Sequence, residues 1–260
     1  MLSAVKHEVD VARSFDAEAA RYDAAYDKPG PHGHLLRLRL SATLDLVGEG
    51  PGRLLDAGMG PGRLCAEACR RGWSAVGVDI SECMVAMAKL RCQDLNASTA
   101  QASVAGLPFR EATFDAVVAT GLIGYLATPQ HHIAELARVL RPDGRLIVSV
   151  SNVDSLAHRL RGPVWYPAVR FAKRRVGTSR PAPPHRPGAV SLRQLEAILA
   201  SCGLTMSEPR YVGVLVIVSQ LEHLWPSATK WLSTRRKWTG RRVGTLLAAQ
   251  IVVSAQSGPA

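Results

Sequence analysis

A short glycine-rich segment near residue 55 is the part of the chain best suited by its residue types to bind a ligand. Residues 56–62 read DAGMGPG, between an apolar run at 53–57 (RLLDA) and a helical pattern over about 63–71. Glycine allows sharp turns and lets a ligand approach the backbone without meeting a Cβ atom. The first turn of a helix offers unpaired N–H groups. The segment therefore predicts a strand–loop–helix binding site.

Two carboxylates accompany this loop. Asp56 precedes Gly58 by two residues, and Asp79 ends a second apolar run, AVGVD, 23 residues later. Asp56 suits a ligand with an ammonium group and would repel a pyrophosphate, whereas Asp79 can accept hydrogen bonds from both hydroxyls of a ribose. The glycines are spaced G-x-G-x-G, and Arg63 stands where a dinucleotide site has its third glycine. The pattern favours a nucleoside that carries an amino acid and disfavours a dehydrogenase.

Short apolar runs alternate with helical patterns around these residues. Further strands are expected at 100–104, 114–120, 145–150, 211–218 and 246–254, with a turn at 142–144. Helices are expected at 63–71, from Ser81 as N-cap to about Cys92, at 130–140, at 192–201 behind Ser191, and at about 221–238. Strands without a polar face belong to a parallel sheet covered by helices on both sides. The expected fold is α/β, a Rossmann-like doubly wound sheet.

Four stretches resemble the class I S-adenosylmethionine (SAM)-dependent methyltransferases of the type 11 group. They are LLDAGMGPGRL (54–64), VGVDIS (76–81), LPF…FDAVVA (107–119) and ELARVLRPDGRLIVSV (135–150). Residues 15–27 and 191–204 are similar to the group's leading and penultimate helices. The group includes ubiquinone and menaquinone biosynthesis enzymes and natural-product methyltransferases. The resemblance implies SAM as cofactor and a seven-stranded sheet whose last strand is antiparallel.

The resemblance also implies how SAM is held. The loop glycines would line the methionine part of SAM, Asp79 would hold the ribose, and Ile80 would lie against the adenine. The group usually has an acidic residue near the adenine amino group, four places before the LPF leucine, where this chain has Ser103. A hydroxyl accepts that hydrogen bond more weakly than a carboxylate, so backbone groups nearby would contribute. The full expected set is Asp56, Gly58, Met59, Gly60, Gly62, Asp79, Ile80, Ser103, Val104, Ala105 and Thr120.

The acceptor should lie beyond the carboxyl ends of the parallel strands. The aromatic side chains expected there are Tyr22, Tyr26, Tyr125 and Trp165. Orientation alone can supply roughly 7–11 kcal/mol of the barrier to methyl transfer, and a base is needed only for an acceptor that arrives protonated. Candidate bases are His131, His132 and His185, because histidine is a common base. The expected reaction is methylation of a small organic acceptor, with O-methylation of a phenolic, quinone-like or natural-product compound as the leading case.

The chain is expected to be one methyltransferase domain with an uneven distribution of charge. It comprises an N-terminal helical cap (1–48), a SAM-binding core (49–150), a basic lid rich in proline and arginine (151–190) and C-terminal helices and strands (191–260). Residues 1–150 carry 16 Lys and Arg against 17 Asp and Glu, whereas residues 151–260 carry 16 against 4, within a net charge of +11. The basic half suits an anionic acceptor or a phospholipid surface, or is a solvated face. Apolar stripes at 164–176 and 221–232 suit peripheral membrane contact, packing on the sheet or a homodimer.

Several other classes are disfavoured. The five cysteines lack disulfide or zinc spacing, so buried reduced thiols and no metal site are expected. Residues 1–15 are too polar for a signal peptide and the apolar stretch at 212–218 is too short for a membrane span, which indicates a cytoplasmic protein. An RNA methyltransferase is an alternative because of the basic half, but no RNP pattern and no Asn/Asp-Pro-Pro-Tyr motif occurs. A non-catalytic SAM-binding partner is the other alternative.

Overall fold

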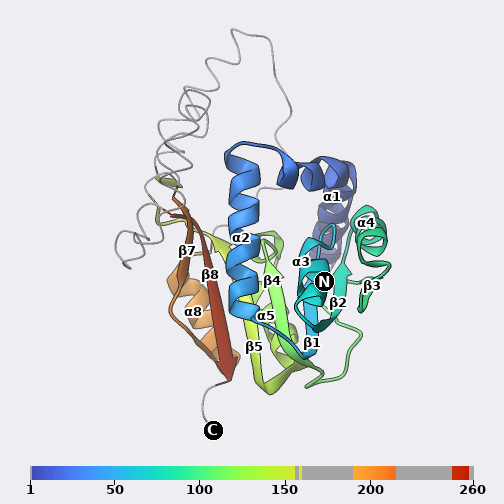
Figure 1. Cartoon of the computed structure of the whole chain (residues 1–260). Coiled ribbons are helices and arrows are strands. Elements are labelled where there is room, and N and C mark those ends of the chain that lie inside the picture. Colours follow the sequence, from blue (N-terminus) through green and yellow to red (C-terminus); the bar gives the residue numbers. More distant parts are fainter. Residues whose placement is uncertain (1, 156–157, 160–189, 215–247, 258–260) are drawn as a thin grey trace.

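A computed structural model describes residues 2–155, 158–159, 190–214 and 248–257 (Figure 1). Trp165, His185, most of the expected lid and the apolar stripes at 164–176 and 221–232 lie outside these residues. Within the described part, no helix is both long enough and apolar enough to cross a bilayer.

A single mixed sheet forms the centre of the molecule. Its strand order is β3-β2-β1-β4-β5-β8-β6, and β7 also pairs with β8. The strands from β1 to β5 are parallel, whereas β8 runs antiparallel to β5, β6 and β7. The expected Rossmann-like α/β sheet with an antiparallel last strand is therefore confirmed. The bounds are β1 (Gly52–Ala57), β2 (Trp73–Asp79), β3 (Ala97–Gln101), β4 (Phe114–Thr120), β5 (Leu140–Ser151), β6 (Leu204–Met206), β7 (Arg210–Val214) and β8 (Ala248–Ser257).

Helices cover both faces of the sheet, as buried parallel strands require (Figure 1). α2 (Pro31–Val47), α3 (Arg63–Arg70) and α4 (Glu82–Cys92) pack on one face, and α5 (Pro129–Val139) and α8 (Leu192–Ser201) on the other. The first core includes Val47 and Leu64, and the second includes Leu136 and Leu199. A short 3-10 helix, η1 (Ile123–Tyr125), follows β4, and the long α1 (Leu2–Asp27) packs against α2 and α4.

Local sequence signals set several helix starts. Ser81 caps α4 because its hydroxyl accepts the N–H of Met84 at 3.2 Å. Ser191 and Gln194 form a capping box at the start of α8. Both caps confirm the starts expected from the sequence.

Three expectations about strands were wrong in detail. The third strand occupies Ala97–Gln101 rather than 100–104, because a partly exposed edge strand of small polar residues gives no apolar pattern. The described sheet has eight strands rather than seven, since β6 and β7 each pair with a different part of β8. The turn expected at 142–144 lies inside β5 at a register irregularity opposite Phe114 and Ala116. Of the cysteines, Cys83 is exposed instead of buried.

Candidate functional site

The loop between β1 and α3 is built on glycines in left-handed conformations. Gly58, Gly60 and Gly62 have φ angles of 72°, 54° and 75°, which strain any residue with a side chain. The N–H of Gly58 donates to the carbonyl of Val78 at 2.8 Å, which ties the loop to β2. A Cβ on Gly62 would come within 2.7 Å of the Ala88 Cβ. Gly62 therefore allows α3 and α4 to pack closely and does not line the cavity beside the loop.

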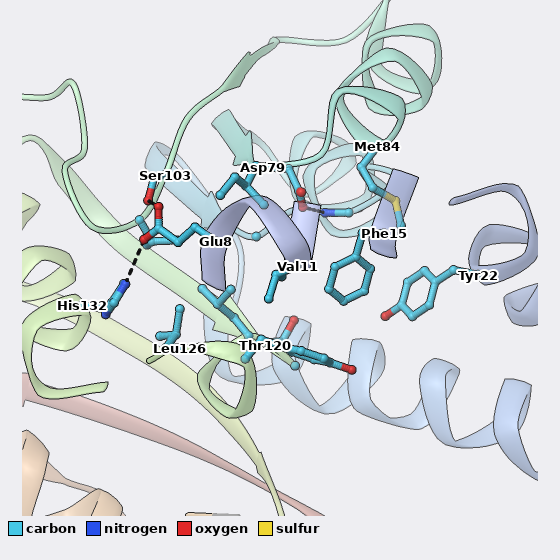
Figure 2. A pocket seen from close by; sticks show the side chains of 17 residues that line it. Glu8, Val11, Phe15, Tyr22, Asp79, Met84, Ser103, Thr120, Leu126 and His132 are labelled. Atoms are coloured by element: carbon cyan, nitrogen blue, oxygen red, sulfur yellow. Dashed lines mark hydrogen bonds and ion pairs between the residues drawn. The ribbon is translucent and has the colours of Figure 1, made fainter. Parts of the chain in front are cut away.

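That cavity, called here the cofactor cavity, lies beyond the carboxyl ends of β1, β2 and β4 and has a volume of about 760 Å³ including its open mouth. In Figure 2, Asp79 lies between Ser103 on one side and Tyr22 on the other. A cavity with a carboxylate between its two ends suits a nucleoside with a substituent. The residues expected from the sequence that line it are Tyr22, Gly58, Gly60, Asp79, Ile80, Ser103, Val104, Thr120, Tyr125 and His132.

Asp79 is held rigidly by two backbone N–H groups. Its Oδ2 accepts the N–H of Gly60 at 2.8 Å and its Oδ1 accepts the N–H of Ser81 at 2.9 Å. Burial raises the pKa of the Asp79 carboxyl, and these two hydrogen bonds oppose that rise. A carboxylate has about four acceptor positions, so both oxygens can still accept hydroxyl donors from the cavity.

A smaller cavity of about 400 Å³ adjoins the glycine loop and is called here the loop cavity. Met59 and Tyr26 line it, together with the charged side chains Asp56, Arg39 and Arg63. Asp56 is 2% exposed and Arg39 is 7% exposed. A buried carboxylate and a buried guanidinium in one cavity match the ammonium and carboxylate of an α-amino acid.

Burial sets the ionisation of Asp56. It raises the pKa of the carboxyl to about 7, against a smaller opposing effect of the hydrogen bond from the Cys65 thiol. Asp56 is therefore balanced between its neutral and charged forms near neutral pH. An ammonium group beside it would favour the charged form.

Arg39 is a buried cation on α2. Its Nη2 donates to the Tyr22 hydroxyl at 3.0 Å, and within the described residues no carboxylate lies within 4.0 Å of it. A buried charge without a counterion is costly. Arg39 is thus prepared to receive an anionic group.

A third cavity of about 810 Å³ shares a wall with the cofactor cavity and is called here the second cavity. The shared residues are Phe15, Tyr22, Gly121 and Tyr125. Arg39, His32, Gln250 and two serines supply polar groups to the second cavity, and leucine, valine and aromatic side chains supply its apolar walls. Partial burial, followed by the positive charges of Arg39 and Arg21, lowers the pKa of His32, which favours its neutral form.

The predicted histidine bases are placed differently from one another. His132 is buried and lines the cofactor cavity, with its Nδ1 2.7 Å from the Thr128 carbonyl. His131 points elsewhere, because its Nε2 lies 3.1 Å from the Ala105 carbonyl on the exposed side of the loop. Ala105 does not line the cavity, but its N–H donates to the Ser103 hydroxyl at 3.1 Å.

Sequence reasoning missed several side chains at these cavities, among them Glu8, His32, Arg39 and Gln250. Arg39 had a signal, since it occupies a helical position between the buried residues Leu36 and Thr43. His32 and Glu8 had none, because only the packing of α1 and α2 over the strand ends brings them to the site.

Ion pairs hold α1 in place over the cavities. Asp23 accepts hydrogen bonds from Arg63 of α3 at 2.7 Å and from Arg91 of α4 at 2.9 Å. The Arg63 guanidinium also lies 4.8 Å from the centre of the Tyr26 ring. The residue that replaces the third glycine of a dinucleotide motif thus connects the loop helix to α1.

Three features together are typical of the class I SAM-dependent methyltransferase fold. They are the parallel sheet, the G-x-G-x-G loop with acids at the ends of β1 and β2, and a cavity suited to a nucleoside that carries an amino acid. Residues 55–148 match a family model described as a methyltransferase domain, of type 11. Over these residues the chain is thus similar to the SAM-dependent methyltransferases of this group.

Two curated relatives show what the chain is similar to. A demethylmenaquinone methyltransferase of Beutenbergia cavernae is 39% identical over 145 residues, 54% of this chain and 57% of that protein. A ubiquinone biosynthesis O-methyltransferase of Alkalilimnicola ehrlichii is 31% identical over 150 residues, 56% of this chain and 60% of that protein. The matched region thus spans less than two thirds of either relative.

A solved structure shows that the likeness in fold extends further than the likeness in sequence. The magnesium protoporphyrin IX methyltransferase of Synechocystis, solved with bound S-adenosylhomocysteine, superposes with a TM-score of 0.63 at 16% identity, over 97% of this chain and all of that chain. At this identity the comparison supports a shared fold alone.

Proposed function

We propose that this chain is a SAM-dependent methyltransferase that methylates a small phenolic or quinone-like acceptor, with oxygen as the methylated atom. The observation that carries the proposal is the shared wall of two cavities, one beside the glycine loop and one lined by polar groups on an apolar background. The methyl group of a donor and the reacting atom of an acceptor would meet where the two cavities adjoin, beside Tyr22 and Gly121.

The residues around the cofactor and loop cavities fit the parts of SAM. Asp79 would hold the ribose hydroxyls, Asp56 the ammonium and Arg39 the carboxylate of the methionine part. When bound, SAM supplies an electrophilic methyl group on a sulfonium. Phe15 and Tyr125 pack edge to face with ring centres 5.1 Å apart beside both cavities, which would exclude water from the reacting atoms.

The second cavity offers what a hydroxyl acceptor needs. The Oε1 of Gln250 is buried and has no hydrogen-bond partner in the described part of the chain, so it can accept from an acceptor hydroxyl. His32, which also lines the cavity, can take a proton from that hydroxyl in its neutral form. The apolar walls suit an aromatic ring. The names of the two relatives, both linked to quinones, favour the same class of acceptor.

Methyl transfer from labelled SAM tests this proposal. The chain is incubated with a panel of phenols and reduced quinones, with total RNA in parallel, and mass spectrometry locates the methyl group. We expect label on an oxygen of a phenolic or quinol acceptor. Label on carbon would overturn O-methylation as the reaction. Label in RNA would overturn the proposal of a small acceptor. Transfer to none of these acceptors would contradict the proposed activity.

A further inference from the structure

The end of the cofactor cavity farthest from the glycine loop contains a carboxylate that comes from α1. Glu8 lines this cavity together with Ser103, Val104 and His132 (Figure 2). The Ser103 hydroxyl donates to Oε2 of Glu8 at 3.0 Å, and Nε2 of His132 lies 3.7 Å from Oε1. The acid that the sequence lacks at position 103 is thus replaced by one from a residue 95 positions earlier in the chain.

The hydrogen bonds of Ser103 leave it little capacity to recognise a ligand by itself. Its hydroxyl donates to Glu8 and accepts the N–H of Ala105 at 3.1 Å. Ser103 therefore orients the Glu8 carboxylate and leaves the role of acceptor to it. A carboxylate is also the stronger acceptor of the two.

His132 leaves Oε1 of Glu8 available. Its Nδ1 lies 2.7 Å from the Thr128 carbonyl, which can only accept, so Nδ1 carries the proton. Nε2 of His132 faces Oε1 of Glu8 across 3.7 Å, which is too long for a hydrogen bond. Oε1 therefore keeps its acceptor positions for a ligand group that has N–H bonds.

We propose that Glu8, oriented by Ser103 and facing His132, binds the exocyclic amino group of the adenine of SAM and makes the cofactor site selective for adenine. The inference rests on the proposed binding of SAM and extends it to a residue outside the methyltransferase domain match. Adenine has an amino group with two hydrogens, whereas hypoxanthine has an oxygen acceptor at the same position. A carboxylate would attract the first base and repel the second.

Two ligands and two variants test this role. Binding of S-adenosylhomocysteine and S-inosylhomocysteine is measured by calorimetry for the intact chain and for Glu8→Ala, with Glu18→Ala as the matched control. Glu18 lies on the same helix, pairs with Arg21 and does not line the cavity. We expect the intact chain and the control to prefer the adenosyl ligand by at least about tenfold, as for a hydrogen bond to a charged group. We expect Glu8→Ala to lose most of this preference.

The outcomes separate this inference from the proposed function. If Glu8 only holds α1 in place, its removal will weaken the binding of both ligands by the same factor, and the proposed role of Glu8 in selectivity will be wrong. A preference that is unchanged in Glu8→Ala contradicts it equally. Glu8→Gln gives a second readout, since its amide can donate to the inosyl oxygen and should narrow or reverse the preference. If the intact chain binds neither ligand, the proposed SAM site itself fails.

Discussion

Buried charges at the ends of β1 and β2, and on α2, are the residue-scale basis of the site. Asp56 and Arg39 are almost fully buried, and no ion pair links them to an opposite charge within the described residues. Buried charges without a partner cost stability and are often found where a ligand compensates them. An amino acid supplies both missing charges at once, which is the reason for assigning them to the methionine part of SAM.

The raised pKa of Asp56 predicts a pH dependence of cofactor binding. The carboxyl has a pKa of about 7, and the ligand ammonium should lower it, so binding releases a proton below that pH. Affinity for S-adenosylhomocysteine should then rise by up to about tenfold per pH unit between pH 5 and 7. Over this range the ligand's α-amino group, with an ordinary pKa of about 8, stays charged. Calorimetry in buffers of different ionisation enthalpy measures both affinity and proton release.

Asp56→Asn is the control for this titration, because it cannot ionise. Its affinity should be lower and independent of pH over the same range. A pH-independent affinity in the intact chain would contradict the ammonium role of Asp56.

His32 is expected to act on the acceptor and not on the cofactor. His32→Gln should lower kcat by about a hundredfold or more with a protonated phenolic acceptor and leave the affinity for S-adenosylhomocysteine within about twofold. Because its pKa is lowered, the intact chain should lose activity only as the pH falls below the usual histidine range, when His32 becomes protonated. Steady-state kinetics against pH measure both effects, and an unchanged kcat in His32→Gln would exclude His32 as the base.

At the scale of elements, α1 is the piece that completes the cofactor cavity. It contributes Glu8, Phe15 and Tyr22 to the wall and is tied to α3 and α4 through Asp23. Burial acts to raise the pKa of Asp23, but its bonds with Arg63 and Arg91 outweigh burial and hold that pKa below its ordinary value of 3.8. The stabilising contribution is complete above the ordinary pKa and is lost as the pH falls through the lowered one.

Removing this tether should loosen α1. Asp23→Ala leaves Arg91 without its carboxylate and Arg63 with Asp27 alone, and it should lower the free energy of unfolding by about 1–3 kcal/mol, as for hydrogen bonds to charged groups. Hydrogen exchange should rise along α1 more than along β4. Arg70→Ala, which removes an exposed pair with Glu67 on α3, is the control and should cost less than about 1 kcal/mol. Exchange in α1 equal to that of the intact chain would contradict the tether.

Elements could be predicted from the sequence where burial and caps leave a clear pattern. The apolar run of β4 and the caps Ser81 and Ser191 placed their elements closely. The predicted position of β3 is shifted along the chain, because the partly exposed residues of this strand are small and polar. The sequence predicts that Gly62 lines the ligand site, whereas in the structure its lack of a Cβ atom allows Ala88 to pack closely against it. A glycine pattern alone does not distinguish these two reasons.

At the scale of the whole molecule, the site residues at strand ends could be predicted from the sequence, whereas those on α1 and α2 could not. Gly58, Asp79 and Thr120 belong to strand ends, and the topology of a parallel sheet brings these to one edge. Glu8 and Arg39 reach that edge only through the packing of α1 and α2, which depends on contacts between residues far apart in the chain. Most of the excess of basic residues follows residue 150, largely outside the described part, so its role stays a prediction.

Titration of the intact chain with S-adenosylhomocysteine, beside Asp79→Ala, tests the central claim most directly. Asp79 lies in the middle of the cofactor cavity and has acceptor positions left for a ribose. We predict saturable binding by the intact chain and an affinity at least about tenfold lower in the variant, with thermal unfolding followed to show that the variant is folded. No binding at millimolar ligand, or equal affinity in a folded Asp79→Ala, would contradict the account.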